Sequence, residues 1–383
     1  MQPIPYSRQQ ITQEDKEAVW NVLGGDFLTQ GPKIAEFEAA FAAYVGARYA
    51  VAVSNGTAAL HLCAMALGVQ PGDKVITSTI TFAASANCVR YCGGEVVFAD
   101  IDPETYILDI KKVEALLKAA APGTYKGIIP VDFTGFPADL EAFRKLADEY
   151  GLWIIEDACH APGGYFTDAK GDKQHCGNGN FADMAIFSFH PVKHIAAGEG
   201  GMVTTNDKAL YDQLLILRSH GITKDPEKLN ENHGGWFYEM QELGYNYRLP
   251  DILAALGLSQ LSKAEAGIVR RQEIARKYHR ELQGLPLQLP LEKEGILNAY
   301  HLYVIQTPRR LDLYNYLRQH QIFTQVHYIP VHTLPYYRLQ MKNRQQLPVA
   351  EAYYSRCLSL PLYPSLTDEE QDYVIETIRK FFQ

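Results

Sequence analysis

The sequence around one lysine indicates a chemical role for its amine rather than that of a solvated surface charge. Lys193 stands between the apolar run Met184–Phe189 and a turn that contains Gly198, Gly200 and Gly201. A lysine amine becomes a nucleophile toward aldehydes when desolvation or a neighbouring cation lowers its pKa, and a Schiff base with pyridoxal phosphate is a common use of such an amine. The glycines permit a tight turn with close backbone approach, which a surface lysine would not require. The segment therefore predicts a lysine that binds this cofactor.

A carboxylate with a matching role follows another apolar segment. Asp157 comes directly after Trp153–Glu156, which is typical of a buried strand. An aspartate at the carboxyl tip of a strand can point into a cofactor site and keep the pyridine nitrogen protonated, so that the ring withdraws electrons. The alternative is that Glu156 and Asp157 begin a solvated loop.

A phosphate site is expected where the segment Ser54–Leu60 opens a helix after a short apolar run. The free amides and the dipole of a helix amino terminus attract anions, so Gly56 and Thr57 are candidate phosphate ligands. Ser188, five residues before the lysine, can add a hydroxyl group. The alternative is an ordinary capping turn, with Ser54 or Asn55 as the N-cap.

Two rings can approach the same cofactor. Phe82 follows the candidate strand Lys74–Thr77 and can stack on the pyridine, although a phenylalanine there can equally belong to the core. His160, three positions after Asp157, can also approach the ring. Its alternative is a loop histidine with ordinary polar partners.

Cysteine and histidine pairs raise a metal alternative. Cys159-His160 and His175-Cys176 offer the ligand types that zinc prefers. The two ligands of each pair are adjacent in sequence, so their side chains diverge along a strand or turn, and no CxxC pair is present. We therefore expect no metal and reduced thiols, and keep a zinc protein as a hypothesis for metal analysis.

Composition narrows the class of protein. The chain has 383 residues, more than one hydrophobic core usually fills, so two domains are expected. The net charge of -8 repels phosphate backbones, which argues against nucleic acid as a partner. The segment Met1–Arg8 lacks a basic region followed by an apolar stretch, and no segment reaches the roughly 18 apolar residues of a membrane span. We expect a cytoplasmic protein without a membrane partner.

Short β-branched runs alternate with helical patterns from residue 49 to about 205, which predicts an α/β fold with a mostly parallel sheet. Ligands of such sheets collect at the carboxyl ends of the strands. The predicted strands are Tyr49–Val53, Lys74–Thr77, Glu95–Ala99, Gly127–Val131, Leu152–Glu156, Met184–Phe189 and Gly201–Thr205, and the predicted helices are Thr57–Leu67, Phe82–Cys92, Ile110–Ala120 and Asp139–Tyr150.

The remaining chain predicts a second, smaller domain. Residues 220–248 form a long, weakly periodic loop that is expected to be functional and to cross to a second subunit. We expect a large domain over residues 1–259, a connecting helix and hinge over 260–295, and a small domain over 296–383. Its expected elements are a helix over 260–283, strands Leu302–Thr307 and Thr324–His327, and helices Leu311–Gln321 and Asp368–Phe382.

With these segments in view, the chain resembles the DegT/StrS family of nucleotide-sugar aminotransferases. That resemblance implies pyridoxal-phosphate fold type I, as in aspartate aminotransferase: a mostly parallel seven-stranded sheet with a smaller C-terminal α+β domain. It extends over nearly the whole chain. Its most specific segments are Ser54–Leu60, Glu156–Ala158, Ser188–Lys193, Gly198–Gly201 and Gly244–Arg248.

The resemblance also implies roles for individual residues. Lys193 would carry the Schiff base, Asp157 would contact the pyridine nitrogen, and Thr57 and Ser188 would bind the phosphate. Asn246 would reach the phosphate of a neighbouring subunit, which implies a homodimer with shared active sites. Arg248 becomes a candidate for the carboxylate of the amino donor. Residues implied to face the sugar nucleotide are Tyr6, Asp26, Phe27, Leu28, Thr29, Val326, His327 and Tyr328.

The expected reaction is a transamination with pyridoxamine phosphate as the intermediate form of the cofactor. Ile4–Ser7 and Ser188–Lys193 are most similar to the 4-aminotransferases of the pseudaminic acid pathway. This subgroup implies L-glutamate as amino donor and a UDP-linked 2-acetamido-2,6-dideoxy-hexos-4-ulose as acceptor. The alternatives are another UDP- or dTDP-linked 4-keto or 3-keto deoxysugar, and a non-catalytic regulator that binds the cofactor.

Overall fold

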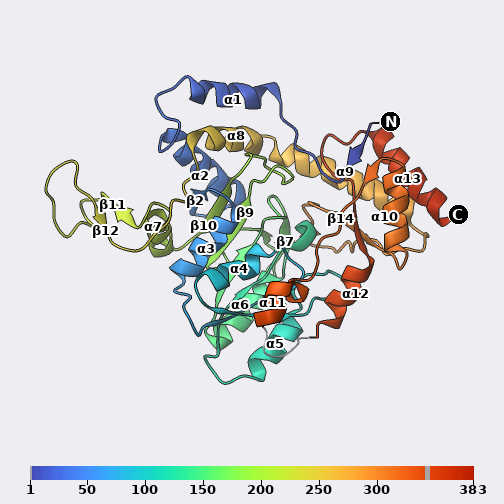
Figure 1. The fold of residues 1–383 in the computed structure, drawn as a ribbon, viewed down its shortest axis with the longest axis horizontal. Helices are drawn as coiled ribbons and strands as arrows, with labels where there is room; N and C mark the ends of the chain where they lie inside the picture. Colours follow the sequence, from blue (N-terminus) through green and yellow to red (C-terminus); the bar gives the residue numbers. More distant parts are fainter. Residues whose placement is uncertain (1, 341–345) are drawn as a thin grey trace.

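A seven-stranded sheet forms the centre of the computed structural model, which describes residues 2–340 and 346–383 (Figure 1). Every neighbouring pair in it is parallel except those of β10, which runs antiparallel to both neighbours. The predicted α/β class is therefore confirmed. In spatial order the strands are β2 (Tyr49–Val53), β10 (Gly201–Thr205), β9 (Met184–Ser188), β6 (Trp153–Asp157), β5 (Tyr125–Ile129), β3 (Lys74–Ser78) and β4 (Glu95–Ala99).

The sequences of the central strands are continuous apolar runs, because helices cover both faces of the sheet. Along β9, Met184 and Ile186 belong to one hydrophobic core, whereas Ala185 and Phe187 belong to another on the opposite face. Each of the seven predicted strands is present, displaced by at most two residues. The largest displacement is at β5, which ends before Pro130, a residue that has no amide hydrogen for a sheet.

Helices cover the two faces. On one side α2 (Pro32–Val45) packs on β9, with the rings of Phe41 and Phe187 4.8 Å apart. The four predicted helices of the α/β region are present with bounds moved by one to two residues. The helices that pack around the sheet are α3 (Gly56–Ala66), α4 (Ala84–Tyr91), α5 (Ile110–Lys118), α6 (Leu140–Tyr150), α7 (Lys208–Leu217) and α8 (Asp251–Leu261).

The helix expected over residues 260–283 is in fact two helices. α8 ends at Leu261, α9 (Ala264–Leu282) begins three residues later, and their axes differ by 55°. No single helix in the described ranges has the length and apolarity for a membrane crossing. The bent pair α8–α9 meets that test by length and composition alone.

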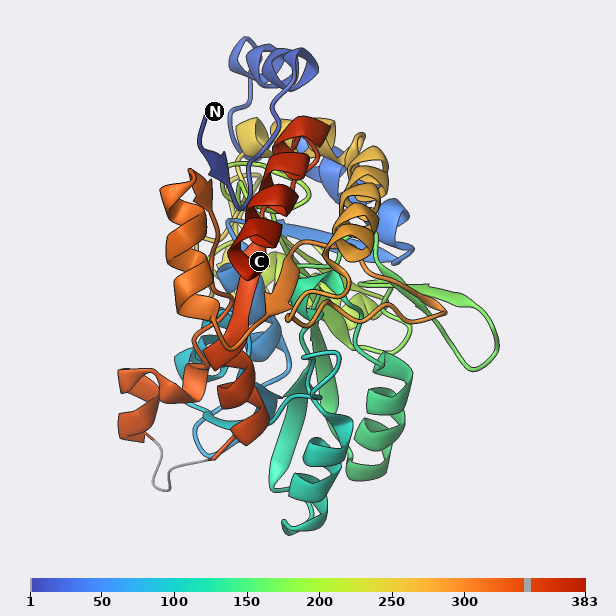
Figure 2. The same cartoon turned by 90° about the vertical axis from the view of Figure 1, so that its right-hand side faces the viewer.

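The C-terminal elements, which face the viewer in Figure 2, share a third hydrophobic core. β14 (Tyr303–Gln306) pairs antiparallel with β16 (Cys357–Leu360), and α10 (Arg310–Gln319) and α13 (Asp368–Phe382) cover them. The expected strand over residues 324–327 is wrong. The strand there is β15 (Ile322–Phe323), which pairs in parallel with β1 (Ile4–Pro5) and so places the first strand of the chain in this core.

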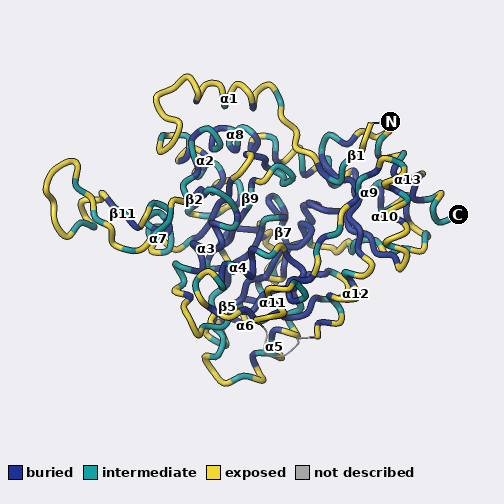
Figure 3. The backbone as a smooth tube through the Cα atoms, in the orientation of Figure 1, coloured by how far each residue is buried: buried dark blue, intermediate teal, exposed yellow. Residues whose placement is uncertain are grey.

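Several short elements have no counterpart among the predicted ones. α1 (Gln13–Leu23) lies on the outside of α8, and β11 (Ile222–Thr223) and β12 (Glu239–Met240) form an extended arm that is largely exposed (Figure 3). A small sheet has the order β13 (Ile296–Leu297), β7 (Tyr165–Thr167), β8 (Lys173–His175). The helices α11 (Pro335–Gln340) and α12 (Pro348–Arg356) follow β15.

Candidate active site

A cavity of about 470 Å³ lies at the carboxyl ends of the central strands, as expected for this kind of sheet. Its walls come from the segments after β2, β3, β5, β6 and β9, and it is closed by residues of the C-terminal part of the chain and by Tyr6, which follows β1. The predicted site residues that line it are Tyr6, Gly56, Thr57, Phe82, Asp157, His160, Ser188, Lys193, His327 and Tyr328.

Lys193 is carried by the loop between β9 and β10. Because β10 runs back along β9, this loop is held at both ends: the Phe189 amide donates to the Gly200 carbonyl at 2.8 Å, and the Ala197 amide to the Phe189 carbonyl at 2.9 Å. Gly198 makes the turn at φ 85°, a conformation that favours glycine. Burial lowers the pKa of the Lys193 amine, which favours the nucleophilic, unprotonated form.

Asp157 ends β6 and is buried, so the alternative of a solvated loop is wrong. Its Oδ2 accepts a hydrogen bond of 2.6 Å from the Ser85 hydroxyl, and its Oδ1 accepts one of 3.2 Å from the Cys159 amide. Ser85 is itself 2.7 Å from the hydroxyl of Thr81. Neutral donors thus orient this carboxylate, and no basic side chain in the described ranges forms an ion pair with it.

The anion site lies at the amino terminus of α3. Asn55 caps the helix by accepting from the Ala58 amide at 2.8 Å, so the capping interpretation and the phosphate interpretation are compatible. A Cβ at Gly56 would lie 3.0 Å from the Cβ of Ser188. A Cβ at Gly201 would lie 2.5 Å from the backbone of Asn55. Glycines at both positions therefore leave a backbone cradle beside the Ser188 hydroxyl.

Aromatic and histidine rings also line the cavity. Phe82 is 64% exposed, so the alternative that it belongs to the core is wrong. His160 is buried, and its Nε2 lies 3.2 Å from the Tyr328 hydroxyl. Burial lowers the pKa of His160 well below its ordinary value, which keeps the ring neutral. The ring of His301 packs against that of His160 at a tilt of 48°, with ring centroids 4.3 Å apart.

The sugar-facing residues implied by the resemblance divide into two groups. Tyr6 lies 5.3 Å from the ring of His327, whose Nδ1 is 2.8 Å from the Ser359 hydroxyl, and burial lowers the pKa of His327 to about 3. Together with Tyr328 they line the cavity. Val326 does not line it; it is half-buried against the neighbouring cores.

The other residues that the resemblance assigns to ligands do not line the cavity of their own chain. Asp26, Phe27, Leu28 and Thr29 form the exposed turn between α1 and α2. Asn246 pairs with Ser219, and Arg248 pairs with Val53 at the end of β2. Their roles in ligand binding remain proposals.

The zinc alternative finds no support in the described part of the chain. The only gathering of possible metal ligands there consists of Asp132, Glu156 and Cys176, so Cys159, His160 and His175 do not join Cys176 in one site.

Some lining residues have no counterpart among the predicted ones. Ser85 contacts Asp157 from the first turn of α4, and only its position three residues after Phe82 hinted at this. His301, Glu199 and Cys159 also line the cavity. Glu199 was within reach of sequence reasoning, because it lies inside the glycine-rich turn. His301 precedes a strand far along the chain, and no local pattern marks it.

The sequence pattern of the DegT/DnrJ/EryC1/StrS aminotransferase family matches residues 9–379. The chain belongs to this family. Its members depend on pyridoxal phosphate, and the cavity fits that cofactor: the Lys193 amine, the Asp157 carboxylate and the glycine cradle at Gly56 lie on its walls. The protein is therefore a pyridoxal-phosphate-dependent sugar aminotransferase with the fold type I architecture.

Individual relatives of the family support the same conclusion. The chain is 41% identical to the spore coat polysaccharide biosynthesis protein SpsC of Bacillus subtilis, over 98% of this chain and 96% of that protein. Helicobacter pylori PseC, an aminotransferase involved in the biosynthesis of pseudoaminic acid, is 31% identical with a TM-score of 0.88, over 100% and 99% of the chains. The sugar aminotransferase Spr1654 of Streptococcus pneumoniae, described as putative and solved in a PMP-form, is 29% identical with a TM-score of 0.88, over 99% and 97%.

Proposed function

We propose that this protein transfers the amino group of L-glutamate to the 4-keto carbon of a UDP-linked 2-acetamido-2,6-dideoxy-hexos-4-ulose. The observation that carries the proposal is the position of the Lys193 amine and the Asp157 carboxylate on the walls of one cavity, with a phosphate cradle between β2 and β9. The similarity to PseC over the whole chain supports the choice of sugar.

Lys193 moves the proton in both half-reactions. Burial lowers the pKa of its amine, so its unprotonated form can remove the proton from the α-carbon of glutamate. In the second half-reaction the protonated amine delivers a proton to C4 of the sugar. Bound pyridoxal phosphate supplies the electron-withdrawing ring and carries the amino group between the halves. The products are 2-oxoglutarate and the 4-amino sugar.

Other residues hold the cofactor and the sugar in position. Asp157, fixed by Ser85 and the Cys159 amide, places its negative charge where the pyridine nitrogen must be held protonated. The amides at Gly56 and Thr57 and the Ser188 hydroxyl bind the phosphate group. Phe82 and His160 contact the ring, and Tyr6, His327 and Tyr328 contact the sugar.

We further propose a homodimer in which residues of one subunit complete the site of the other. Asn246 and Arg248 lie outside the cavity of their own chain, as residues that serve a partner would. The nearby arm exposes apolar side chains, which favours burial against a second copy: Trp236, Tyr238, Met240 and Leu243. Residues Asp26–Thr29 would contact the sugar nucleotide in the same assembly.

Mixing Lys193→Ala and Asn246→Ala subunits should restore activity in the heterodimers, and no recovery would contradict shared sites.

The substrate is tested by amination of a panel of UDP- and dTDP-linked 4-keto-6-deoxyhexoses with glutamate as donor, followed by mass spectrometry. We expect the UDP-linked 2-acetamido sugar to be aminated fastest and one 2-oxoglutarate to form per amino sugar. Lys193→Ala is the control and should give neither product. Faster amination of any other sugar would reject the proposed acceptor.

A second candidate sugar is favoured by the similarity to SpsC, whose name refers to a spore coat polysaccharide. Another UDP- or dTDP-linked keto deoxysugar would then be the acceptor, and the same panel decides between them. A cofactor-binding regulator would instead be yellow but produce no 2-oxoglutarate with any sugar of the panel.

A further inference from the structure

A second cavity, of about 320 Å³, lies behind the loop that carries Lys193. It is enclosed by the segment that joins β1 to α1 and by the junction of α8 and α9, where the Gln260 side chain donates to the Gln10 carbonyl at 2.9 Å. Lys193 is the only residue that it shares with the active-site cavity. The remaining lining residues are Arg8, Gln9, Thr12, His194, Ala196, Lys263, Ala266, Gly267, Arg270, Arg271 and Pro364.

The lining of this cavity is basic. Arg8, Lys263, Arg270 and Arg271 contribute to it, and no aspartate or glutamate does. Two of the cations have acidic partners: Lys263 contacts Asp15, and Arg270 forms ion pairs. Arg8 is exposed and forms neither a hydrogen bond nor an ion pair within residues 2–340 and 346–383. The cavity therefore has an excess of positive charge over the acidic groups around it.

Arg271 is the most unusual of these residues, because it is 1% exposed and has no carboxylate partner in the described part of the chain. Its Nη1 donates to the carbonyl oxygens of Tyr300, His301 and Leu362 at 3.0, 3.4 and 3.2 Å. Its Nε has no hydrogen-bond partner. A buried guanidinium without a counter-charge is costly, and a bound anion would reduce that cost.

We propose that this second cavity binds a phosphate group, with Arg271 at its inner wall and Arg8 and Lys263 at its rim. Phosphate suits the site because it is small for the volume, doubly charged and able to accept from several cationic donors at once. The side-chain amides of Gln9 and Gln10 supply further neutral donors, whereas Thr12 and Gln260 already donate to Asp15. The cavity is distinct from the cradle at Gly56, which the cofactor phosphate fills.

An anion here would act on the active site through a shared wall. Lys193 lines both cavities, and its neighbour His194, which lines the second, is fixed by a 2.9 Å contact between its Nε2 and the Ala299 carbonyl. A negative charge next to this wall favours protonation of the neighbouring amine. Phosphate should therefore raise the pH at which the absorbance of the bound cofactor changes.

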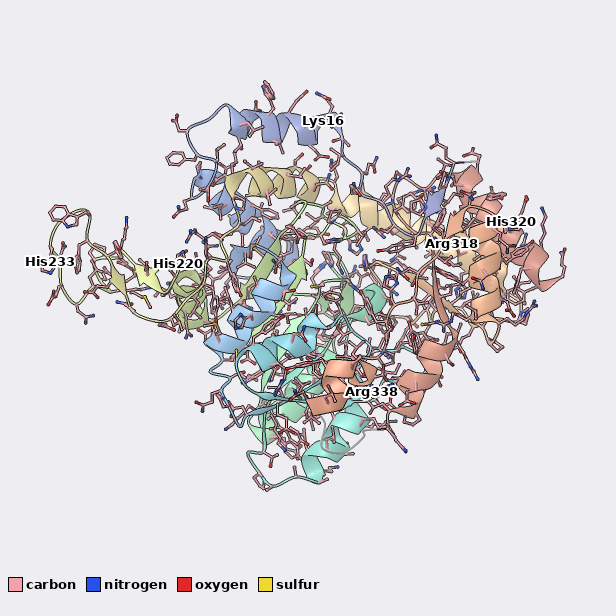
Figure 4. All side chains as sticks on the ribbon, viewed as in Figure 1. Lys16, His220, His233, Arg318, His320 and Arg338 are labelled. Atoms are coloured by element: carbon pink, nitrogen blue, oxygen red, sulfur yellow. The ribbon has the colours of Figure 1, made fainter. Side chains whose placement is uncertain are left out.

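The test is calorimetric titration of the holoenzyme with inorganic phosphate at constant ionic strength, with chloride as the monovalent comparison. The cofactor already fills its own phosphate cradle, and variants of residues that line only the second cavity separate binding there from binding where the sugar nucleotide is proposed to lie. We expect Arg8→Gln and Lys263→Gln to weaken phosphate binding by about tenfold each, the size of one charge-assisted hydrogen bond. Arg338→Gln is the matched control, because Arg338 is exposed on α11, far from α8 and α9 (Figure 4).

Two results would overturn the proposal: heats for phosphate no larger than for chloride, or equal affinity in Arg8→Gln, Lys263→Gln and the unaltered protein. Titration with UDP separates the sources of the phosphate group. If Arg8→Gln and Lys263→Gln weaken the binding of UDP as they weaken the binding of phosphate, the cavity takes the nucleotide; if they weaken only the binding of phosphate, the ligand is the free ion. Neither readout depends on the sugar substrate, so failure of the proposed function leaves this test intact.

Discussion

At the scale of single residues, the chemistry of Lys193 depends on two opposed influences. Burial lowers the pKa of its amine, whereas the nearby Cys159 and Asp157 act in the opposite direction. Burial is the larger effect, so the amine is more easily deprotonated than a surface lysine. Asp157 can remain close without capturing the lysine in an ion pair, because its two oxygens already accept from Ser85 and from the Cys159 amide.

The hydrogen bond from Ser85 should therefore matter for catalysis. We predict that Ser85→Ala lowers kcat about tenfold, because a hydrogen bond to a charged group contributes about 1.5–3 kcal/mol and the freed carboxylate would turn away from the pyridine nitrogen. Steady-state kinetics with the preferred sugar would measure it. Ser259→Ala is the control, since it removes a similar bond of 2.7 Å to Asp15 outside the cavity. Equal kcat values for the two variants would contradict the role of Ser85.

Sequence reasoning located the residues that lie at strand ends. Asp157 and Lys193 follow apolar runs, and the topology of a parallel sheet brings such positions to one edge. Ser85 and His301 could not be found in this way, because their contacts depend on how α4 and the C-terminal elements pack on that edge. The exposure of Phe82 was equally hidden, since an isolated phenylalanine is compatible with a core position.

At the scale of elements, the amino terminus of α3 must approach β10 closely. We predict that Gly201→Ala weakens binding of pyridoxal phosphate, because the added Cβ would lie 2.5 Å from the Asn55 backbone and displace the cradle. Overpacking of this kind costs about 1–3 kcal/mol, which corresponds to roughly tenfold or more in affinity. Equilibrium dialysis of the reconstituted apoprotein would show the change. Gly235→Ala, which meets no atom within 4 Å, should bind normally.

The turn between α1 and α2 is held by a buried carboxylate. Asp251 is fully buried, and its two oxygens accept from the Gly31 and Lys33 amides at 2.8 and 3.0 Å, at the amino terminus of α2. We predict that Asp251→Asn lowers the free energy of unfolding by about 1 kcal/mol and raises KM for the sugar nucleotide without changing kcat, because Asp26–Thr29 would be less well positioned. Denaturant titration and kinetics measure the two effects.

The matched control for that variant is Asp109→Asn. Asp109 caps α5 by accepting from the Lys111 amide at 2.8 Å, on an exposed part of the surface. The Asp109→Asn variant should lose a comparable amount of its free energy of unfolding and keep the KM of the unaltered protein. An equal change of KM in both variants would contradict the proposed role of Asp251 in substrate binding.

The seven central strands were predictable because each is a run of buried apolar residues. The short strands were not: β1 and β15 have two residues each, and only their mutual pairing defines them. The strand expected over residues 324–327 failed for the same reason, since Gln325 there forms only a single bridge with Ser359. The break between α8 and α9 was not predictable, because no proline or glycine stands at that point of the sequence.

At the scale of the whole molecule, we infer that the smaller domain comprises residues 296–383 together with β1, and that residues 260–295 connect it to the larger one. Ile4 lies fully buried in the same core as Ile322 and Leu358. The active-site cavity is lined by residues of both domains and by Tyr6, which follows β1. Folding of the site therefore requires both domains to be in place.

Buried histidines should make the protein sensitive to acid. Burial lowers the pKa values of His160, His194, His301 and His327, so the unfolded chain takes up their protons near pH 6.5 while the folded chain does not. Stability is then lost as the pH falls below about 6.5. The buried pair Asp132 and Glu156, whose pKa values are raised by burial, acts in the opposite direction but involves fewer groups.

Denaturant titrations from pH 7 to pH 5 would measure this loss. In His301→Asn the slope of the free energy of unfolding against pH should decrease by about 1.4 kcal/mol per pH unit, because about one fewer proton is taken up on unfolding. His233→Asn is the control, because His233 is exposed on the arm (Figure 4). Identical slopes in the unaltered protein and His301→Asn would refute the assignment.

The pairing of β1 with β15 also has a mechanical consequence. Residue 4 belongs to the core of the C-terminal elements, and residue 382 packs against that core. A pulling force applied between residues 2 and 383 would first separate the two-residue ladder of β1 and β15 and peel α13 away. The large sheet lies between these two points along the chain, so it would bear load only after the smaller domain has yielded.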